Sequence, residues 1–154
     1  MKKMHFLIAL TVFAMLSVTV SAQVQHTLHP NYLEALGQLR DARWLLIHRG
    51  VNDPAQAKEE QKAIAEVEAA IKEITNAAID DGKSLDHAPH EDNKAYTVKD
   101  RLKWAYEYMR KADKNILHED ANPVATDMRN RCHAHIKEAQ NNIELLWNVY
   151  KIPR

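Results

Sequence analysis

Four stretches of this chain repeat apolar residues at intervals of three and four positions, the spacing of one face of an α-helix. The stretches cover residues 30–48, 54–79, 98–117 and 123–150. Only three glycines occur in the whole chain, and few glycines favour helix throughout. Each apolar stripe is narrow, so we expect the four helices to face one another in a bundle. The stripes consist, in order, of Tyr32, Leu36, Leu39, Ala42 and Leu46; Ile64, Val67, Ile71, Ile74 and Ala78; Leu102, Ala105, Met109, Ala112 and Ile116; and Met128, Cys132, Ile136, Ala139, Ile143 and Leu146.

Local signals mark where these helices start. His29-Pro30, Asp53-Pro54 and Asn122-Pro123 each place proline at a first helical position, where its missing N–H costs nothing. The sequence Thr97-Val98-Lys99-Asp100 resembles a capping box. The four helices are therefore expected to begin near residues 30, 54, 98 and 123.

The two halves of the helical region match one another, which predicts one αα-hairpin used twice, as 30–79 and 97–150, with linker 80–96 between them. Because the loop inside each hairpin is short, we predict an all-α fold, an antiparallel up-down-up-down four-helix bundle. At an offset of 70, the matches are Leu39, Arg40, Ala42, Leu46, Ile47 and His48 with Met109, Arg110, Ala112, Ile116, Leu117 and His118; at 69, they are Pro54, Val67, Ala70 and Ile74 with Pro123, Ile136, Ala139 and Ile143.

The first 22 residues have the pattern of a secretory signal peptide. Lys2 and Lys3 precede an apolar run over residues 6–20, and Val20 and Ala22 are the small residues of a cleavage site. The run is too short for a comfortable membrane span. We therefore expect cleavage after Ala22 and a periplasmic or secreted protein.

The mature chain, residues 23–154, has a length that suits one domain. It starts with Gln23 rather than Cys, which argues against a lipoprotein anchor. The mature chain has no second apolar run that would predict contact with a membrane. Without Lys2 and Lys3 its net charge is about −2, so no basic surface predicts a nucleic-acid partner. Cys132 is the only cysteine, so packing rather than an intramolecular disulfide must stabilise the fold. The oligomeric state stays open.

Histidines and carboxylates gather before the first helix and in the linker. In the expected bundle, helix 30–48 begins at the end where helix 54–79 finishes, so these two groups can meet. Imidazole and carboxylate together suit zinc, copper or nickel. The expected ligands are His29, Asp80, Asp81 and His87, with His26 and His90 as outer candidates. The alternative interpretation is a solvated connector. The same arrangement places His48 and His118 together at the opposite end.

Cys132 and His135 form a C-x-x-H pair, which could supply half of a zinc or copper(I) site. Cys132 lies on the core stripe, however, and a buried thiol is the favoured interpretation. Haem is a remote alternative. Arg129 occupies the position where covalent attachment needs a first cysteine, and non-covalent haem would need a methionine such as Met109 or Met128 with His135.

The sequence has neither the context of a catalytic serine nor a Gly-rich phosphate loop, so we expect no enzyme. The expected function is an exported, non-enzymatic helical protein that binds a transition metal through the His/Asp cluster. The competing expectation is an interaction or envelope stress module whose surface meets another envelope protein without metal.

The sequences HPNYLEALGQLRDARWLL and AAIDDGKSLDHAP resemble a family of secreted bacterial proteins that share H-P-x-Y-L-x-A-L and A-A-I-D-D-G-K-x-L motifs. The resemblance covers residues 29 to about 146 and implies a small helical exported protein. It implies no particular activity. Members often have DDHPP where this chain has Asp86-His87-Ala88-Pro89-His90, which weakens a role for His90 more than one for His87. The chain is more loosely similar to small periplasmic metal-binding four-helix proteins, which carry many more histidines.

Overall fold

A computed structural model describes residues 30–50, 57–80, 96–118 and 123–153. Within these ranges the secondary structure is entirely helical, which confirms the predicted all-α four-helix bundle. No helix in these ranges has both the length and the apolar character needed to cross a membrane. The helices are α1 (Pro30–Ile47), α2 (Lys58–Asp80), α3 (Val98–Leu117) and α4 (Pro123–Val149).

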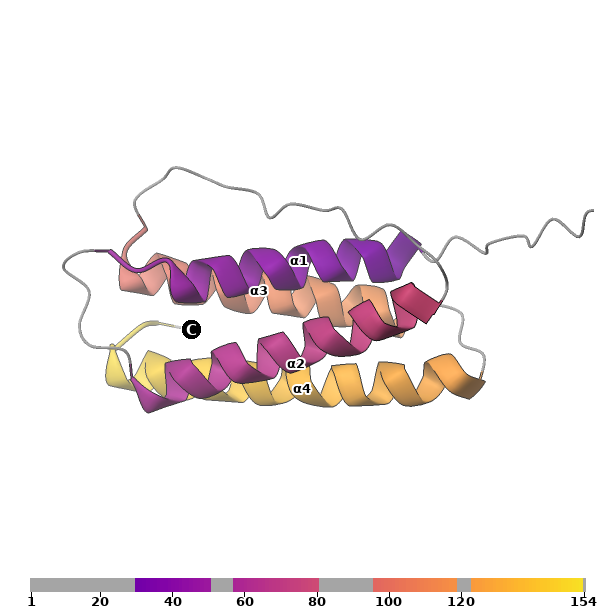
Figure 1. Cartoon of the computed structure of the whole chain (residues 1–154). Helices are drawn as coiled ribbons and strands as arrows, with labels where there is room; N and C mark the ends of the chain where they lie inside the picture. Colours follow the sequence, from indigo (N-terminus) through magenta and orange to yellow (C-terminus); the bar gives the residue numbers. More distant parts are fainter. Residues whose placement is uncertain (1–29, 51–56, 81–95, 119–122, 154) are drawn as a thin grey trace, which may run out of the picture.

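The helices pack in two pairs. Helix α1 lies along α3, and α2 lies along α4, with α1 also touching α2 and α3 touching α4 (Figure 1). The closest packing therefore joins a helix of the first hairpin to a helix of the second. Each hairpin buries its apolar face mainly against the other hairpin, so the two hairpins share a single core.

The core contains the predicted stripes of α1, α3 and α4 in full. In α2 the buried stripe is rotated slightly from the prediction. Ala63 and Ala70 are fully buried, whereas Ile64 and Ile71 are half-buried at the margin. We attribute this to close packing of α2 on α4, because small residues let two helix backbones approach closely and larger side chains then occupy the edges.

The order of helix directions differs from the predicted up-down-up-down arrangement. Arg101, in the first turn of α3, donates a hydrogen bond to the carbonyl oxygen of Leu45 near the end of α1 (2.8 Å). Asn115, near the end of α3, donates to Gln38 in the middle of α1 (3.1 Å). Helix α3 thus runs antiparallel to α1 and parallel to α2, and the observed order is up-down-down-up (Figure 1).

This direction corrects the predicted placement of two histidines. His48 follows α1 at the end where α3 begins, whereas His118 follows α3 at the end where α1 begins. The two histidines therefore lie at opposite ends of the bundle, not together. The error followed directly from assuming that α3 runs parallel to α1.

Corresponding positions of the two predicted hairpins form ion pairs. Arg43 pairs with Glu68 across α1 and α2, with the Nε and Oε1 atoms 2.7 Å apart. The matching positions of the second hairpin are Asp113 and Lys137, whose Oδ2 and Nζ atoms are 3.1 Å apart. The same pair of positions thus forms an ion pair in each hairpin, with the two charges exchanged.

The helix starts agree with the sequence signals at three of four positions. Thr97 accepts a hydrogen bond from the Asp100 backbone N–H (3.1 Å) and donates its hydroxyl hydrogen to the Asp100 carboxylate (2.6 Å). Helix α2, however, begins at Lys58 rather than Pro54, and Asp53-Pro54 lies outside the described residues. Glu59 and Glu60 occupy the first turn of α2, where carboxylates complement the helix dipole.

Helix α4 ends in a Schellman-type turn. The Ile152 N–H bonds to the Trp147 carbonyl (2.8 Å), and the Lys151 N–H to the Asn148 carbonyl (3.4 Å). Lys151 has a positive φ of 52°, the left-handed conformation that this turn requires. Ile152 is buried, so the turn returns the chain onto the core.

Candidate functional site

The predicted metal site depends on α1 starting where α2 ends, and the described contacts show this arrangement. Arg43 pairs with Glu68, and Arg49, just after the end of α1, pairs with Glu60 (Nη1 to Oε2, 2.5 Å). Residue numbers rise along α1 as they fall along α2, so the two helices are antiparallel. Pro30 and Asp80, the first residue of α1 and the last of α2, consequently lie at the same end (Figure 1).

Most of the predicted ligands are outside the described residues. Asp80 is the last residue of α2, while His29 directly precedes the first residue of α1 and Asp81 directly follows α2. The predicted ligands outside the described ranges are His26, His29, Asp81, His87 and His90.

The corrected direction of α3 adds a histidine to this end of the bundle. His118 caps α3, is exposed, and its ring Nδ1 lies 2.7 Å from the Lys114 carbonyl oxygen. A carbonyl oxygen can only accept, so Nδ1 donates and the lone pair of a neutral ring is on Nε2. Such an imidazole is oriented by the protein and has one nitrogen free to bind a metal.

Across the described part of the chain, no three His, Cys, Asp or Glu side chains are grouped so that they could hold a metal ion. His133 and His135, although two positions apart on α4, face different neighbours. His133 Nδ1 donates to the Asp113 carboxylate (2.5 Å), and His135 Nδ1 donates to the Glu66 carboxylate (2.6 Å). Each histidine is therefore held by a single carboxylate, one at the α3/α4 contact and one at the α2/α4 contact.

The His133–Asp113 pair orients an imidazole, as a general base would require. Lys137 also contacts Asp113, which ties the carboxylate into the packing of α3 on α4. The neighbouring Cys132 thiol points the other way, into the core, where it lies 3.7 Å from the Ala70 carbonyl oxygen. We therefore assign the pair to helix packing.

Burial raises the pKa of the Cys132 thiol to about 12, and the negative charges of Asp113 and Glu73 add to the effect. A thiol that holds its proton so firmly is a poor metal ligand and a poor nucleophile. The prediction of a buried, structural cysteine is confirmed. The haem alternative gains no support, because Met109 is in the core while His135 is half-buried at the α2/α4 contact, paired with Glu66.

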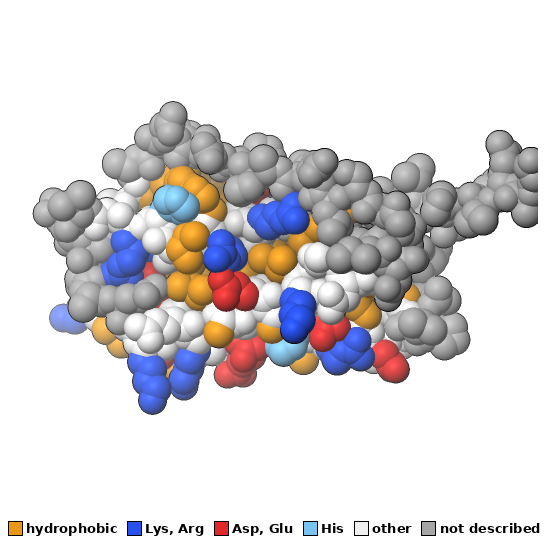
Figure 2. Space-filling model, in the orientation of Figure 1, with side chains coloured by type: hydrophobic (Ala, Val, Ile, Leu, Met, Phe, Trp, Pro, Cys, Tyr) orange, Lys and Arg blue, Asp and Glu red, His pale blue; other side chains and the backbone are white. Residues whose placement is uncertain are grey.

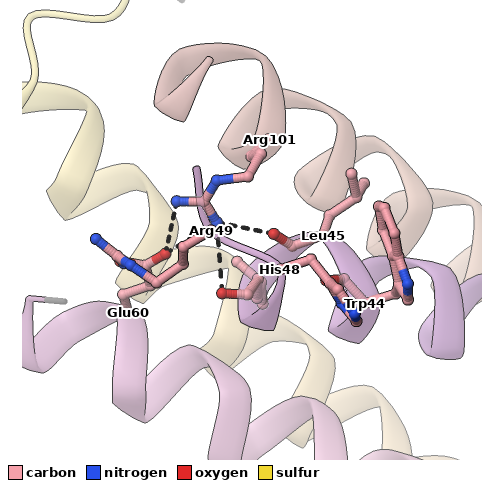
Figure 3. A network of polar contacts seen from close by, with 7 residues as sticks. Trp44, Leu45, His48, Arg49, Glu60 and Arg101 are labelled. Atoms are coloured by element: carbon pink, nitrogen blue, oxygen red, sulfur yellow. Dashed lines mark hydrogen bonds and ion pairs between the residues drawn. The ribbon is translucent and has the colours of Figure 1, made fainter. Parts of the chain in front are cut away.

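The opposite end of the bundle contains a buried polar network (Figure 3). Arg101 Nη1 and Nη2 each lie 3.2 Å from Glu60 Oε1, and both side chains are buried. Arg101 also donates to the carbonyl oxygens of Leu45 (2.8 Å) and Leu46 (3.4 Å), close to the C-terminus of α1. Arg49 completes the network at Glu60 Oε2. This network joins α1, α2 and α3 at one point.

Sequence reasoning missed this network, although a signal existed. Glu60 is three positions before Ala63 and seven before Val67, so it is in register with the buried stripe of α2. A carboxylate on the apolar face of a helix needs a cationic partner, because an unpaired buried charge is very costly. Nothing in the spacing, however, identified Arg101 as that partner.

The aromatic residues form separate contacts rather than one patch. Trp44 stacks on His48 with ring centroids 4.3 Å apart, and Tyr106 packs on Trp147 at 4.8 Å. The Tyr106 hydroxyl donates to Glu144 (2.8 Å), and burial together with this carboxylate raises the Tyr106 pKa above its usual value of 10.0. Trp104 is half-exposed. On the face drawn in Figure 2, basic and acidic side chains are interspersed.

Comparisons of the chain with protein-family models, with curated proteins and with solved structures find no match. The interpretation of function therefore depends on the residues and on their positions in the bundle.

Proposed function

We propose that this chain is an exported, non-enzymatic helical protein that binds a transition metal at the end of the bundle where α1 begins and α2 ends. One observation carries the proposal: Pro30 and Asp80 lie at the same end. In the sequence, His29 directly precedes α1 and Asp81 directly follows α2, and about fifty residues separate them. His87 completes the proposed set, with His26 and His90 as outer candidates.

Ligand chemistry supports zinc, copper or nickel over a hard cation. Two or more imidazoles with one or two carboxylates suit these borderline metals, whereas calcium and magnesium prefer oxygen ligands alone. A helical bundle supports such a site well, since the rigid ends of two antiparallel helices fix where the ligand-bearing segments start. The chain from residue 23 has eight histidines, and five of them are among the proposed ligands or at the same end of the bundle.

Isothermal titration calorimetry of the chain from residue 23 with Zn²⁺, Cu²⁺ and Ni²⁺ tests the proposal. We expect one of the three to bind with a dissociation constant of about micromolar or tighter. The double variant His29→Ala plus His87→Ala should lose most of this affinity. A control variant, His133→Ala plus His135→Ala, removes two histidines from the side of the bundle and should bind as the wild type does. Weaker binding by the wild type, or binding unchanged in the first variant, would refute the proposal.

The competing proposal is an interaction module that meets another envelope protein without metal. Exposed apolar side chains favour it, among them Trp104 on α3 and Leu145 and Val149 on α4. These residues are on the helices rather than at the proposed metal site, so the two proposals are separable. A Trp104→Ser plus Leu145→Ser variant should leave metal affinity unchanged while weakening any association driven by these side chains.

A further inference from the structure

The charges of the bundle are divided unevenly between α2 and α3. Helix α3 has six Lys and Arg residues against three Asp and Glu, a net charge of +3, whereas α2 has three against six, a net charge of −3. In α1 and α4 the two signs balance. Among the four described helices, α2 and α3 make no contact with one another, so they lie on a diagonal of the bundle (Figure 1). The balance of charge over the whole chain conceals this division.

The carboxylates of α2 are compensated by cationic side chains of neighbouring helices. Glu68 pairs with Arg43 of α1, and Glu73 pairs with Arg131 of α4 (2.9 Å). Glu60 is buried in the arginine network at the start of the helix. These carboxylates are therefore engaged in contacts that hold the bundle together, and they do not offset the charge of α3 on its far side.

The side of α3 that faces away from the core is basic. Helix α3 buries the stripe that includes Leu102, Ala105 and Met109, and the exposed side lies opposite to it. Two carboxylates share the exposed side, and both are engaged within α3 or at its cap. Asp100 accepts from Thr97, and Glu107 pairs with Arg110 (2.8 Å). We call this surface the basic face; its exposed side chains are Lys99, Lys103, Arg110, Lys111 and Lys114.

Aromatic side chains border the basic face. Trp104 is 49% exposed, although indole is a large and mostly apolar group. Tyr108, one helical turn further on, is half-buried, and the Lys111 Nζ lies 5.5 Å from the centre of its ring. Exposed indole beside lysines is typical of helices that lie at a membrane surface. There the indole lies at the level of the headgroups, and the lysine stems extend their ammonium groups towards phosphate.

We propose that the basic face of α3, together with Trp104, docks on the anionic surface of a phospholipid bilayer. Each lysine close to such a surface adds to the attraction, and a helix of this length, about 30 Å, spans several headgroups. Four of the five basic side chains are lysines. Interfaces between folded proteins favour arginine and are depleted in lysine, so the composition fits lipid better than an acidic protein. The inference does not rest on metal binding.

Cosedimentation with lipid vesicles tests the proposal. The chain from residue 23 is used, because the apolar run over residues 6–20 would bind membranes by itself. Vesicles of phosphatidylcholine alone are compared with vesicles of equal parts phosphatidylcholine and phosphatidylglycerol, at low and at high salt. We expect the protein to bind the anionic vesicles but not the neutral ones, and salt to release it, because salt screens exposed charges.

Two double variants with the same loss of charge locate the contact. Lys103→Gln plus Lys114→Gln removes two charges from the basic face and should lower the affinity for anionic vesicles about tenfold to thirtyfold. The control, Lys62→Gln plus Lys72→Gln, removes two exposed charges from α2 and should bind as the wild type does. Circular dichroism checks that all variants are folded.

Tryptophan fluorescence reports whether the indole enters the lipid. Emission of the wild type should shift to shorter wavelength on anionic vesicles, and Trp104→Phe should lose this shift while Trp44 and Trp147 remain. A shift that persists in Trp104→Phe would contradict the role of this residue.

Three other outcomes overturn the proposal. The first is no binding to anionic vesicles, and the second is equal binding to neutral ones. The third is equal weakening by the two double variants, because net charge rather than the basic face is then the cause. Analytical ultracentrifugation without lipid identifies a second copy as the occupant instead. In that case the wild type associates with itself, Lys103→Gln plus Lys114→Gln does not, and vesicles are not bound.

Discussion

Arg101 at the start of α3 contacts Glu60 in the first turn of α2 through both of its terminal nitrogens, and both side chains are buried. The same guanidinium contacts backbone carbonyls at the end of α1. The contact brings the starts of α2 and α3 to one end of the bundle, together with the end of α1. It therefore specifies the direction of α3, which in turn decides which histidines share an end.

Arg101→Ala should destabilise the bundle strongly. The substitution removes one of the two arginines that pair with the buried Glu60 carboxylate and leaves its contact with Arg49, and breaking a buried ion pair costs about 3 to 5 kcal/mol. Urea denaturation followed by circular dichroism measures the loss. Arg43→Ala is the control, since its pair with Glu68 is exposed and such pairs contribute about 0 to 1 kcal/mol. Similar losses in the two variants would show that the Arg101 contact does not specify the fold.

Sequence patterns predicted the helices and most of the core because both depend on local spacing. The stripes of α1, α3 and α4 are buried as expected, and Thr97 caps α3 as its capping box indicated. In α2 the pattern identified the correct face to within about one position. Side chains such as Ala63 and Ile64 are adjacent in sequence, and packing against α4 decides which of them is more deeply buried.

The direction of α3 could not be predicted from spacing. Seventeen residues separate Asp80 from Val98, and fully extended they could span about 55 to 60 Å. A helix of the length of α3 is only about 30 Å long. The connection can therefore return α3 to either end. The choice depends on long-range contacts such as Arg101 with Glu60, and His118 was misplaced in the prediction for this reason.

Cys132 should react slowly with a thiol reagent in the native protein. Burial raises its pKa to about 12, so the reactive thiolate is scarce at pH 8 and the sulfur is shielded. Reaction with Ellman's reagent should be complete within minutes in guanidinium chloride and far slower in buffer. Equally fast labelling in both conditions would contradict the buried position.

The same thiol should make stability depend on pH in alkaline solution. The unfolded thiol loses its proton near the ordinary value of 9.0, while the folded thiol keeps it until about pH 12. Between these values the folded state binds the extra proton, so raising the pH favours unfolding. Wild type should lose more stability from pH 9 to 11 than Cys132→Ala, measured by urea denaturation. Parallel pH profiles would contradict this expectation.

Lys151→Gly should stabilise the protein. Lys151 has a positive φ, which costs a residue with a side chain about 1 to 2 kcal/mol, whereas glycine adopts this conformation freely. After the greater flexibility of glycine in the unfolded chain is subtracted, the expected gain is about 0.5 to 1 kcal/mol. Lys151→Ala retains the Cβ and should show no such gain in thermal unfolding. A gain shared by both variants would point to the lost charge instead.

The most direct test of the proposed metal site is paramagnetic broadening by Cu²⁺ in the ¹H–¹⁵N NMR spectrum of the chain from residue 23. Bound copper should broaden the amide signals of the first turn of α1 and the last turns of α2 and α3, including His118, at substoichiometric metal. The signals of His48, Thr97 and Glu60, at the far end of the bundle, should stay sharp. Broadening centred on that far end, or spread evenly over the helices, would contradict a metal site where α1 begins and α2 ends.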